Sequence, residues 1–138
     1  VLKQIGIQKS IVCHSRDGLD EFSIFEETDY VYFDGTKAEK MVFSPSSLKG
    51  LGQVKEEEVF TKTKEDSFRL FQTVLSGRAT SGTDMVALNA GAALFVTGRT
   101  ESISEGFDLA KEALISKKVL KFVRETLNLS QAIESLDK

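Results

Sequence analysis

Two acidic residues stand side by side where a short loop follows an apolar segment. Asp20 and Glu21 come after the β-branched run 11–12, and residues 15–19 between them include several turn formers. Two neighbouring carboxylates can meet one hard cation, and Mg²⁺ typically takes only one or two protein carboxylates together with waters and substrate phosphates. The pair therefore predicts a magnesium site. The same spacing also fits two solvated turn residues, so the residues alone leave both interpretations open.

The chain's single histidine and single cysteine directly precede this loop. His14 could act as an acid, a base or an anion donor near neutral pH. A lone histidine at a strand end, with no evident triad partner, is more often a structural hydrogen-bonding residue. Cys13 alternates with His14 along the strand, so we expect the thiol to face the core as a small apolar group. Neither residue is predicted to be catalytic.

The sequence contains no glycine-rich phosphate cradle of the dinucleotide or Walker type. The nearest candidate is the segment Gly77–Gly82, which has two glycines and one cation, but it fits a connection between two helices better. Asn89 is polar within an otherwise apolar helical segment and must find hydrogen-bonding partners if it is buried. We interpret Asn89 as a structural hydrogen bond between layers, ahead of a contact with a ligand.

Strands and a hairpin are predicted in the first part of the chain. The run 9–14 is predicted to be a buried strand, and residues 1–6 look like the last turns of a helix that ends at Gly6. Two strand-like runs, 30–33 and 40–43, flank an Asp-Gly turn, which is a strong hairpin signal. Ser44 and Pro45 then suggest a short helical turn.

Four helical segments are predicted in the second part. Residues 63–76 begin with acids in the first turn, which the helix macrodipole favours, and an apolar segment over 84–96 should be buried, with small residues that allow close packing. Two amphipathic segments follow, at about 102–114 and 118–127. The acidic run 55–58 between the strands and these helices is interpreted as a solvated linker.

The composition excludes several classes of function. Eighteen basic and twenty-one acidic residues give a net charge of -3, so no positive field attracts nucleic acid. One cysteine cannot form an internal disulfide and leaves too few ligands for structural zinc. We find no stretch long enough to cross a membrane and no signal peptide, which favours a cytoplasmic protein.

These elements predict an α/β fold: the carboxyl-terminal portion of a mixed sheet flanked by helices, with one β-hairpin and about four helical segments. A strand such as 9–14 usually has parallel neighbours on both sides, and no other segment supplies them. The chain also begins without a methionine. We therefore expect residues 1–138 to be part of one α/β domain, with the preceding region absent.

Four segments, in order, resemble the anthranilate phosphoribosyltransferase family. Residues 11–21 resemble its Val-Val-His-Gly signature followed by Asp-Gly-Leu-Asp-Glu. Residues 43–45 resemble the family's proline-opened turn after the hairpin. Residues 88–95 resemble its buried Asn-Ala helix, and residues 102–110 resemble the next helix with its Glu-Gly step. Together these motifs cover almost the whole chain.

The resemblance implies a transferase that moves phosphoribosyl from phosphoribosyl pyrophosphate to anthranilate in tryptophan biosynthesis. It also implies that Asp20 and Glu21 are the magnesium ligands and that the full-length enzyme is a homodimer. The family's helical amino-terminal domain, glycine-rich phosphoribosyl pyrophosphate loop and Lys-His-Gly-Asn segment have no counterpart in this sequence. We therefore expect this chain to be inactive alone.

Two other interpretations stay open. One is the related pyrimidine nucleoside phosphorylase type of enzyme, against which the acidic pair argues. The other is a non-catalytic module that binds a partner. The sequence also departs from the family's pattern at Ser15, where the family has glycine, and at residues 67–68, where the family usually has Asn-Ala.

Overall fold

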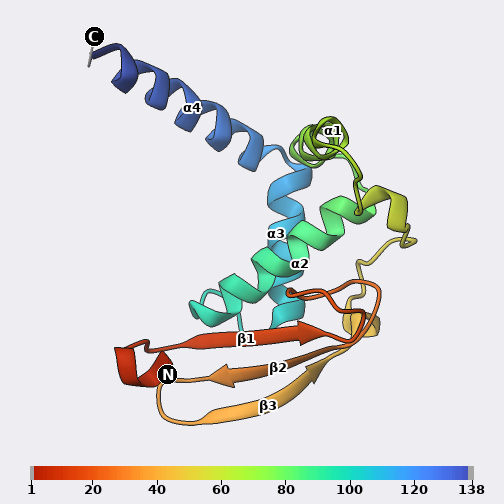
Figure 1. The fold of residues 1–138 in the computed structure, drawn as a ribbon, viewed down its shortest axis with the longest axis vertical. Helices are drawn as coiled ribbons and strands as arrows, with labels where there is room; N and C mark the ends of the chain where they lie inside the picture. Colours follow the sequence, from red (N-terminus) through yellow and green to blue (C-terminus); the bar gives the residue numbers. More distant parts are fainter. Residues whose placement is uncertain (1, 137–138) are drawn as a thin grey trace.

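The computed structural model describes residues 2–136, with the side chains of residue 2 and of residues 4–129. A three-stranded sheet lies at one end, the helices α2 and α3 cross over one of its faces, and α4 leads away from the body (Figure 1). In chain order the elements are η1 Leu2–Ile5, β1 Ser10–Ser15, β2 Thr28–Phe33, β3 Ala38–Phe43, η2 Pro45–Ser47, η3 Glu56–Glu58, α1 Lys64–Leu75, α2 Ser81–Val96, α3 Ile103–Ile115 and α4 Lys118–Leu136. The predicted α/β class, the hairpin and the four helical segments are confirmed within this part of the chain.

The hairpin between β2 and β3 forms where the Asp-Gly pair predicted it. The last paired residues are Phe33 and Ala38, so residues 34–37 make the turn. The Asp34 carboxylate accepts hydrogen bonds from the backbone N–H of Thr36 at 2.7 Å and of Lys37 at 2.9 Å. Gly35 has a φ of 107°, a conformation that a side chain would strain.

The predicted burial of β1 was wrong for the described residues. The strand lies at the edge of the sheet and pairs antiparallel with β2, in register from Ser10 opposite Phe33 to Ser15 opposite Thr28. It is only partly buried, and Val12 is 57% exposed. The β-branched run suggested a central parallel strand. Within residues 2–136 the helices cover only one face of the sheet, so alternate side chains of β1 face away from the core.

The helix starts follow from hydroxyl caps. Thr63 caps α1 by accepting from the N–H of Asp66 at 3.1 Å, and Ser102 caps α3 by accepting from the N–H of Glu105 at 3.1 Å. The helix α2 is capped by Thr80 and begins at Ser81, three residues before the predicted start. The difference arises because residues 81–83 are small and polar but are buried.

Two further segments differ from the predictions. The segment 55–58 is no simple linker: residues 56–58 form a 3₁₀ turn, and the Glu58 carboxylate accepts from the N–H of Ser81 at 2.8 Å, at the start of α2. That hydrogen bond lowers the pKa of Glu58 below its ordinary value. The helix α4 continues to Leu136, beyond the predicted end near residue 127. No helix in the described part of the chain is long and apolar enough to span a membrane.

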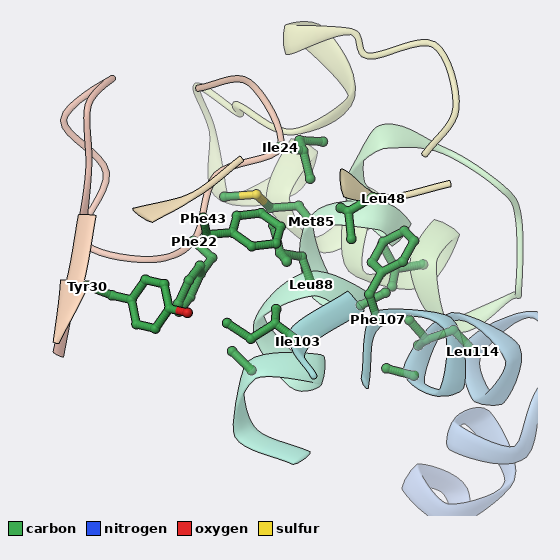
Figure 2. Close-up of a cluster of buried hydrophobic side chains, with 14 residues drawn as sticks. Phe22, Ile24, Tyr30, Phe43, Leu48, Met85, Leu88, Ile103, Phe107 and Leu114 are labelled. Carbon is green, nitrogen blue, oxygen red and sulfur yellow. The ribbon is translucent and has the colours of Figure 1, made fainter. Parts of the chain in front are cut away.

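One hydrophobic core joins the sheet to the helices (Figure 2). Phe22 sits at its centre, 2% exposed, with ring centroids 5.4 Å from Tyr30 and 5.5 Å from Phe43. From the helical side, Leu88 of α2 and Phe107 of α3 are fully buried. This cluster anchors the middle of the β1–β2 loop in the body of the protein.

The helices α2 and α3 touch through their glycines. A Cβ atom at Gly91 would overlap the backbone of Gly106 and Phe107, and a Cβ atom at Gly106 would overlap the backbone of Gly91. The predicted close packing of this small-residue segment is thus confirmed, and its partner is α3.

Candidate metal centre

The acidic pair lies in the loop of residues 16–27 between β1 and β2. The backbone closes the base of this loop, because Ser15 N–H donates to the Leu19 carbonyl and Arg16 N–H donates to the Glu27 carbonyl, both at 2.9 Å. The side chain of Arg16 also pairs with Glu27 and reaches both Asp29 carboxylate oxygens, at 3.0 and 3.1 Å. These contacts hold together the ends of β1 and β2, which carry the loop.

Asp17 braces the loop from within. Its carboxylate accepts from the Ser23 hydroxyl at 2.5 Å and from the Leu19 N–H at 3.1 Å. Partial burial alone would raise the pKa of Asp17, but these hydrogen bonds outweigh it and bring the pKa below its ordinary value. Asp17 is therefore a structural acid.

Asp20 and Glu21 are different. Both are exposed, and neither carboxylate makes a hydrogen bond or an ion pair with any side chain or backbone group that the structure describes. The pKa of Glu21 is raised by partial burial and by the negative charge of Asp20. Two like charges are thus held next to each other without neutralisation by the described residues.

The partial burial of Glu21 has a structural cause. Its side chain lies at the edge of an apolar hollow of about 510 Å³, whose lining includes Val59, Met85 and Val86. A carboxylate in such a position is less well solvated than one on an open surface. A divalent cation bound by both carboxylates would offset the repulsion between their negative charges and also the poor solvation of the Glu21 carboxylate.

The donor set of the pair fits magnesium. Carboxylate oxygens are the ligands that Mg²⁺ prefers, and this ion commonly keeps several waters and takes the rest of its ligands from substrate phosphates. Among the described residues, no group of three or more histidine, cysteine, aspartate or glutamate side chains gathers at one point. A closed, all-protein metal cage is therefore not formed by this part of the chain.

Asn89 reaches the loop from α2. Its side-chain carbonyl accepts from the N–H of Phe22 at 3.0 Å, and its amide nitrogen donates to the Phe22 carbonyl at 2.9 Å and to the Met85 carbonyl at 3.1 Å. The interpretation of Asn89 as a structural hydrogen bond between layers is confirmed. Its partner is Phe22, the residue directly after Glu21. The sequence did not indicate this contact.

The cysteine and the histidine lie on opposite faces of β1. Cys13 stands opposite Tyr30 on the face toward the helices, and its thiol lies 3.9 Å from the backbone oxygen of Asp20. Burial, followed by the charges of Asp20 and Glu21, raises the pKa of Cys13. His14 is exposed on the other face, opposite Asp29, and is not brought to the acidic pair.

The segment Gly77–Gly82 is a structural connection, as its composition favoured. Gly77 has a φ of 78°, and a Cβ atom there would lie 2.8 Å from the Ile115 carbonyl oxygen. A Cβ atom at Gly82 would lie 2.7 Å from the Glu58 carbonyl oxygen. Both glycines are needed for close approach of neighbouring backbone.

This fold and this loop define an α/β domain that presents two unneutralised carboxylates beside a layer of helices. The chain belongs to the family described as "Glycosyl transferase family, a/b domain", whose sequence profile matches residues 1–119. An anthranilate phosphoribosyltransferase of Geobacillus sp. (strain WCH70) is 38% identical over 118 residues, which are 85% of this chain and 34% of that protein. One from Aquifex aeolicus (strain VF5) is 33% identical over 132 residues, 96% of this chain and 38% of that protein. The chain thus spans about a third of the length of the curated relatives it matches.

Solved structures give the same result. The crystal structure of anthranilate phosphoribosyltransferase from Thermus thermophilus superimposes with a TM-score of 0.75 at 29% identity, covering 90% of this chain and 36% of that one. The enzyme from Saccharomyces cerevisiae in complex with PRPP and Mg matches with a TM-score of 0.65 at 22% identity, covering 84% and 33%. The second match shows a shared fold. Together these findings confirm the family resemblance inferred from the sequence motifs.

Proposed function

We propose that this chain is the carboxyl-terminal part of the α/β domain of an anthranilate phosphoribosyltransferase. In this proposal the whole enzyme is a cytoplasmic homodimer that transfers phosphoribosyl from phosphoribosyl pyrophosphate to anthranilate in tryptophan biosynthesis. The named relatives and the motif of residues 11–21 support the activity. Asp20 and Glu21 are the proposed magnesium ligands.

The observation that carries the metal assignment is that this pair of carboxylates, without partners among the described residues, stands on a loop that other contacts hold in place. Asp17, only three residues away, is fully engaged by Ser23 and Leu19, whereas the carboxylates of Asp20 and Glu21 are exposed and make no hydrogen bond or ion pair with the described residues. A loop so firmly braced, in which two adjacent carboxylates have no partner among the described residues, is arranged to bind something outside itself. The yeast structure that shares this fold is described with PRPP and Mg, which makes those ligands the first to test.

The chemistry assigns a clear role to the pair. When phosphoribosyl is transferred, negative charge grows on the leaving pyrophosphate, and a magnesium ion supplies electrostatic stabilisation of that charge. Asp20 and Glu21 would hold the ion by their carboxylate oxygens, while Asp17 and Ser23 fix the loop that presents them. Such pre-positioning avoids reorganisation during the reaction.

The chain alone is expected to lack transferase activity. It contains neither the glycine-rich phosphoribosyl pyrophosphate loop nor the Lys-His-Gly-Asn segment of the family. Product formation from anthranilate and phosphoribosyl pyrophosphate by the purified chain would contradict this expectation. Activity regained on adding the amino-terminal part of a relative would separate an enzyme portion from a non-catalytic binding module.

Calorimetric titration of magnesium with pyrophosphate tests the metal assignment. We expect binding to be lost in the double variant Asp20→Asn, Glu21→Gln. The control is Glu56→Gln, Glu57→Gln, which removes the same charge from another adjacent and exposed acidic pair. Equal binding by all three proteins would place the cation elsewhere. If none binds, the same substitutions in a full-length relative decide the question.

A further inference from the structure

Asn89 holds the residue that follows the acidic pair. The side chain spans from the middle of α2 to the loop and engages both backbone polar groups of Phe22, at 3.0 Å to the nitrogen and 2.9 Å to the oxygen. An asparagine amide carries one acceptor and a donor in the same plane, which is the pattern of a peptide group. Asn89 therefore acts on Phe22 as a neighbouring strand would.

The orientation of this amide is fixed. Its second N–H donates to the Met85 carbonyl, one turn earlier in α2, at 3.1 Å. Both amide protons and the carbonyl are thus used, so a flipped side chain would lose all three hydrogen bonds. Because Met85 belongs to a buried part of α2, the amide stands on a rigid support.

Phe22 is immobilised from two directions. Its ring is packed between Tyr30 and Phe43 in the core, and its backbone is held by Asn89 (Figure 2). On the other side of the pair, Leu19 is fixed through its carbonyl to Ser15 and through its N–H to Asp17. Only Asp20 and Glu21 lie between these two held residues.

We propose that Asn89 is a positioning residue for the Asp20–Glu21 pair. It sets the backbone at Phe22 and with it the direction in which the Glu21 side chain leaves the chain. This inference rests on the proposed metal role of the pair. Groups that orient metal ligands through hydrogen bonds typically change metal affinity by about ten- to a hundredfold when they are removed.

Titration with Mn²⁺ alone tests the inference without any enzyme assay, because Mn²⁺ accepts the same hard oxygen ligands. Paramagnetic broadening of the amide resonances of residues 19–23 reports the site, and its concentration dependence gives the affinity. In Asn89→Ala we expect affinity to fall by about tenfold or more. The amide of Phe22 should also exchange with solvent faster than in the unchanged chain.

The control is Leu48→Ala. Leu48 is a core residue, 5% exposed, just after η2, and it does not line the hollow beside Glu21, so this variant loses stability without altering the surroundings of the acidic pair. It should keep its Mn²⁺ affinity. If Asn89→Ala does not fold, Asn89→Asp replaces it: the carboxylate still accepts from the Phe22 N–H but cannot donate to the Phe22 carbonyl, so affinity should again fall.

The outcomes separate the inference from the proposed function. If Asp20→Asn, Glu21→Gln abolishes Mn²⁺ binding while both Asn89 variants bind as tightly as the unchanged chain, the role of Asn89 is overturned and the metal site stands. Equal losses in Asn89→Ala and Leu48→Ala also overturn it, since they reflect stability alone. If the double acidic variant binds normally, the metal assignment falls and the inference with it. If the unchanged chain does not bind Mn²⁺, the inference is overturned for this chain, while the metal assignment is decided in the full-length relative.

Discussion

The Asp84 carboxylate lies 2.6 Å from the Lys111 ammonium, so that a buried ion pair joins the first turn of α2 to α3. Lys111 also donates to the Gly50 carbonyl at 2.6 Å, and the N–H of Gly52 donates to Asp84 at 3.3 Å. The pair thus fastens the segment after η2 to both helices. Asp84 is only 6% exposed at its side chain.

Replacement of Lys111 by methionine is expected to destabilise the protein strongly. The variant leaves the Asp84 carboxylate buried without its cation, a change that typically costs about 3–5 kcal/mol. Urea denaturation measures the free energy of unfolding. As a control, Lys121→Met removes a lysine that is 79% exposed and pairs with Glu125, and such pairs contribute about 1 kcal/mol or less. Similar losses in the two variants would contradict a buried role for Lys111.

A side chain at Gly91 is expected to separate the two central helices. Gly91→Ala places a methyl group against the backbone of Gly106 and Phe107, where main-chain atoms cannot move aside cheaply. Overpacking of this kind costs about 1–3 kcal/mol or more. Gly52→Ala is the matched control, because its Cβ would lie 3.7 Å from the Asp84 carboxylate, which is ordinary contact. Thermal unfolding that is unchanged in Gly91→Ala would refute the close crossing.

The turn acid Asp34 gives the hairpin a pH dependence. Hydrogen bonds from the N–H of Lys37, then from the N–H and hydroxyl of Thr36, lower its pKa from 3.8 to about 2. Because the folded value is depressed, the charged carboxylate stabilises the fold above about pH 4, and this contribution is lost as pH falls toward 2.

Asp34→Asn should therefore lower the melting temperature at pH 6 and have much less effect at pH 2. Asparagine keeps one acceptor oxygen but carries no charge, so the comparison isolates the ionised form. Melting curves at pH 6, 4 and 2 for both proteins provide the measurement. A difference that stays constant over this range would show that the charge of Asp34 does not support the turn.

The thiol of Cys13 reports the charge of the acidic pair. Burial and the nearby Asp20 and Glu21 raise its pKa, which lowers the thiolate fraction and slows alkylation. We expect iodoacetamide to react faster with Cys13 in Asp20→Asn, Glu21→Gln. The Glu56→Gln, Glu57→Gln variant should react at the unchanged rate. Equal rates in all three proteins would mean that the pair lies too far from the thiol to influence it.

Local signals in the sequence predicted local structure. The Asp-Gly pair predicted the hairpin. The acidic first turn after Thr63 and the amphipathic pattern from Ser102 placed two helix starts to within a residue. The neighbours of β1 were beyond such reasoning, because strand pairing depends on contacts far apart along the chain. The start of α2 was missed for a related reason: its small polar first turn becomes buried only through packing against residues 53–58.

The candidate site, like the fold, could be predicted only in part from the sequence. The adjacency of Asp20 and Glu21 is visible in the sequence, and so is the loop that carries them. Their support is not, since Asn89 and Phe22 are 67 positions apart and the Ser23–Asp17 contact depends on how the loop folds back. Asn89 did stand out as a polar residue in an apolar helix. That signal predicted a hydrogen-bonding partner for Asn89 but not which residue it would be.

The contact between Gly91 and Gly106 has a mechanical consequence. Two helices whose backbones touch have no layer of side chains between them that could repack, so α2 and α3 form one rigid unit at this crossing. Asn89, two residues before Gly91, forms its hydrogen bonds to Phe22 from this rigid unit. The helix crossing and the acidic loop are therefore joined by a short, continuous path of contacts through Asn89, so a change that separates α2 from α3 is expected to disturb the loop as well.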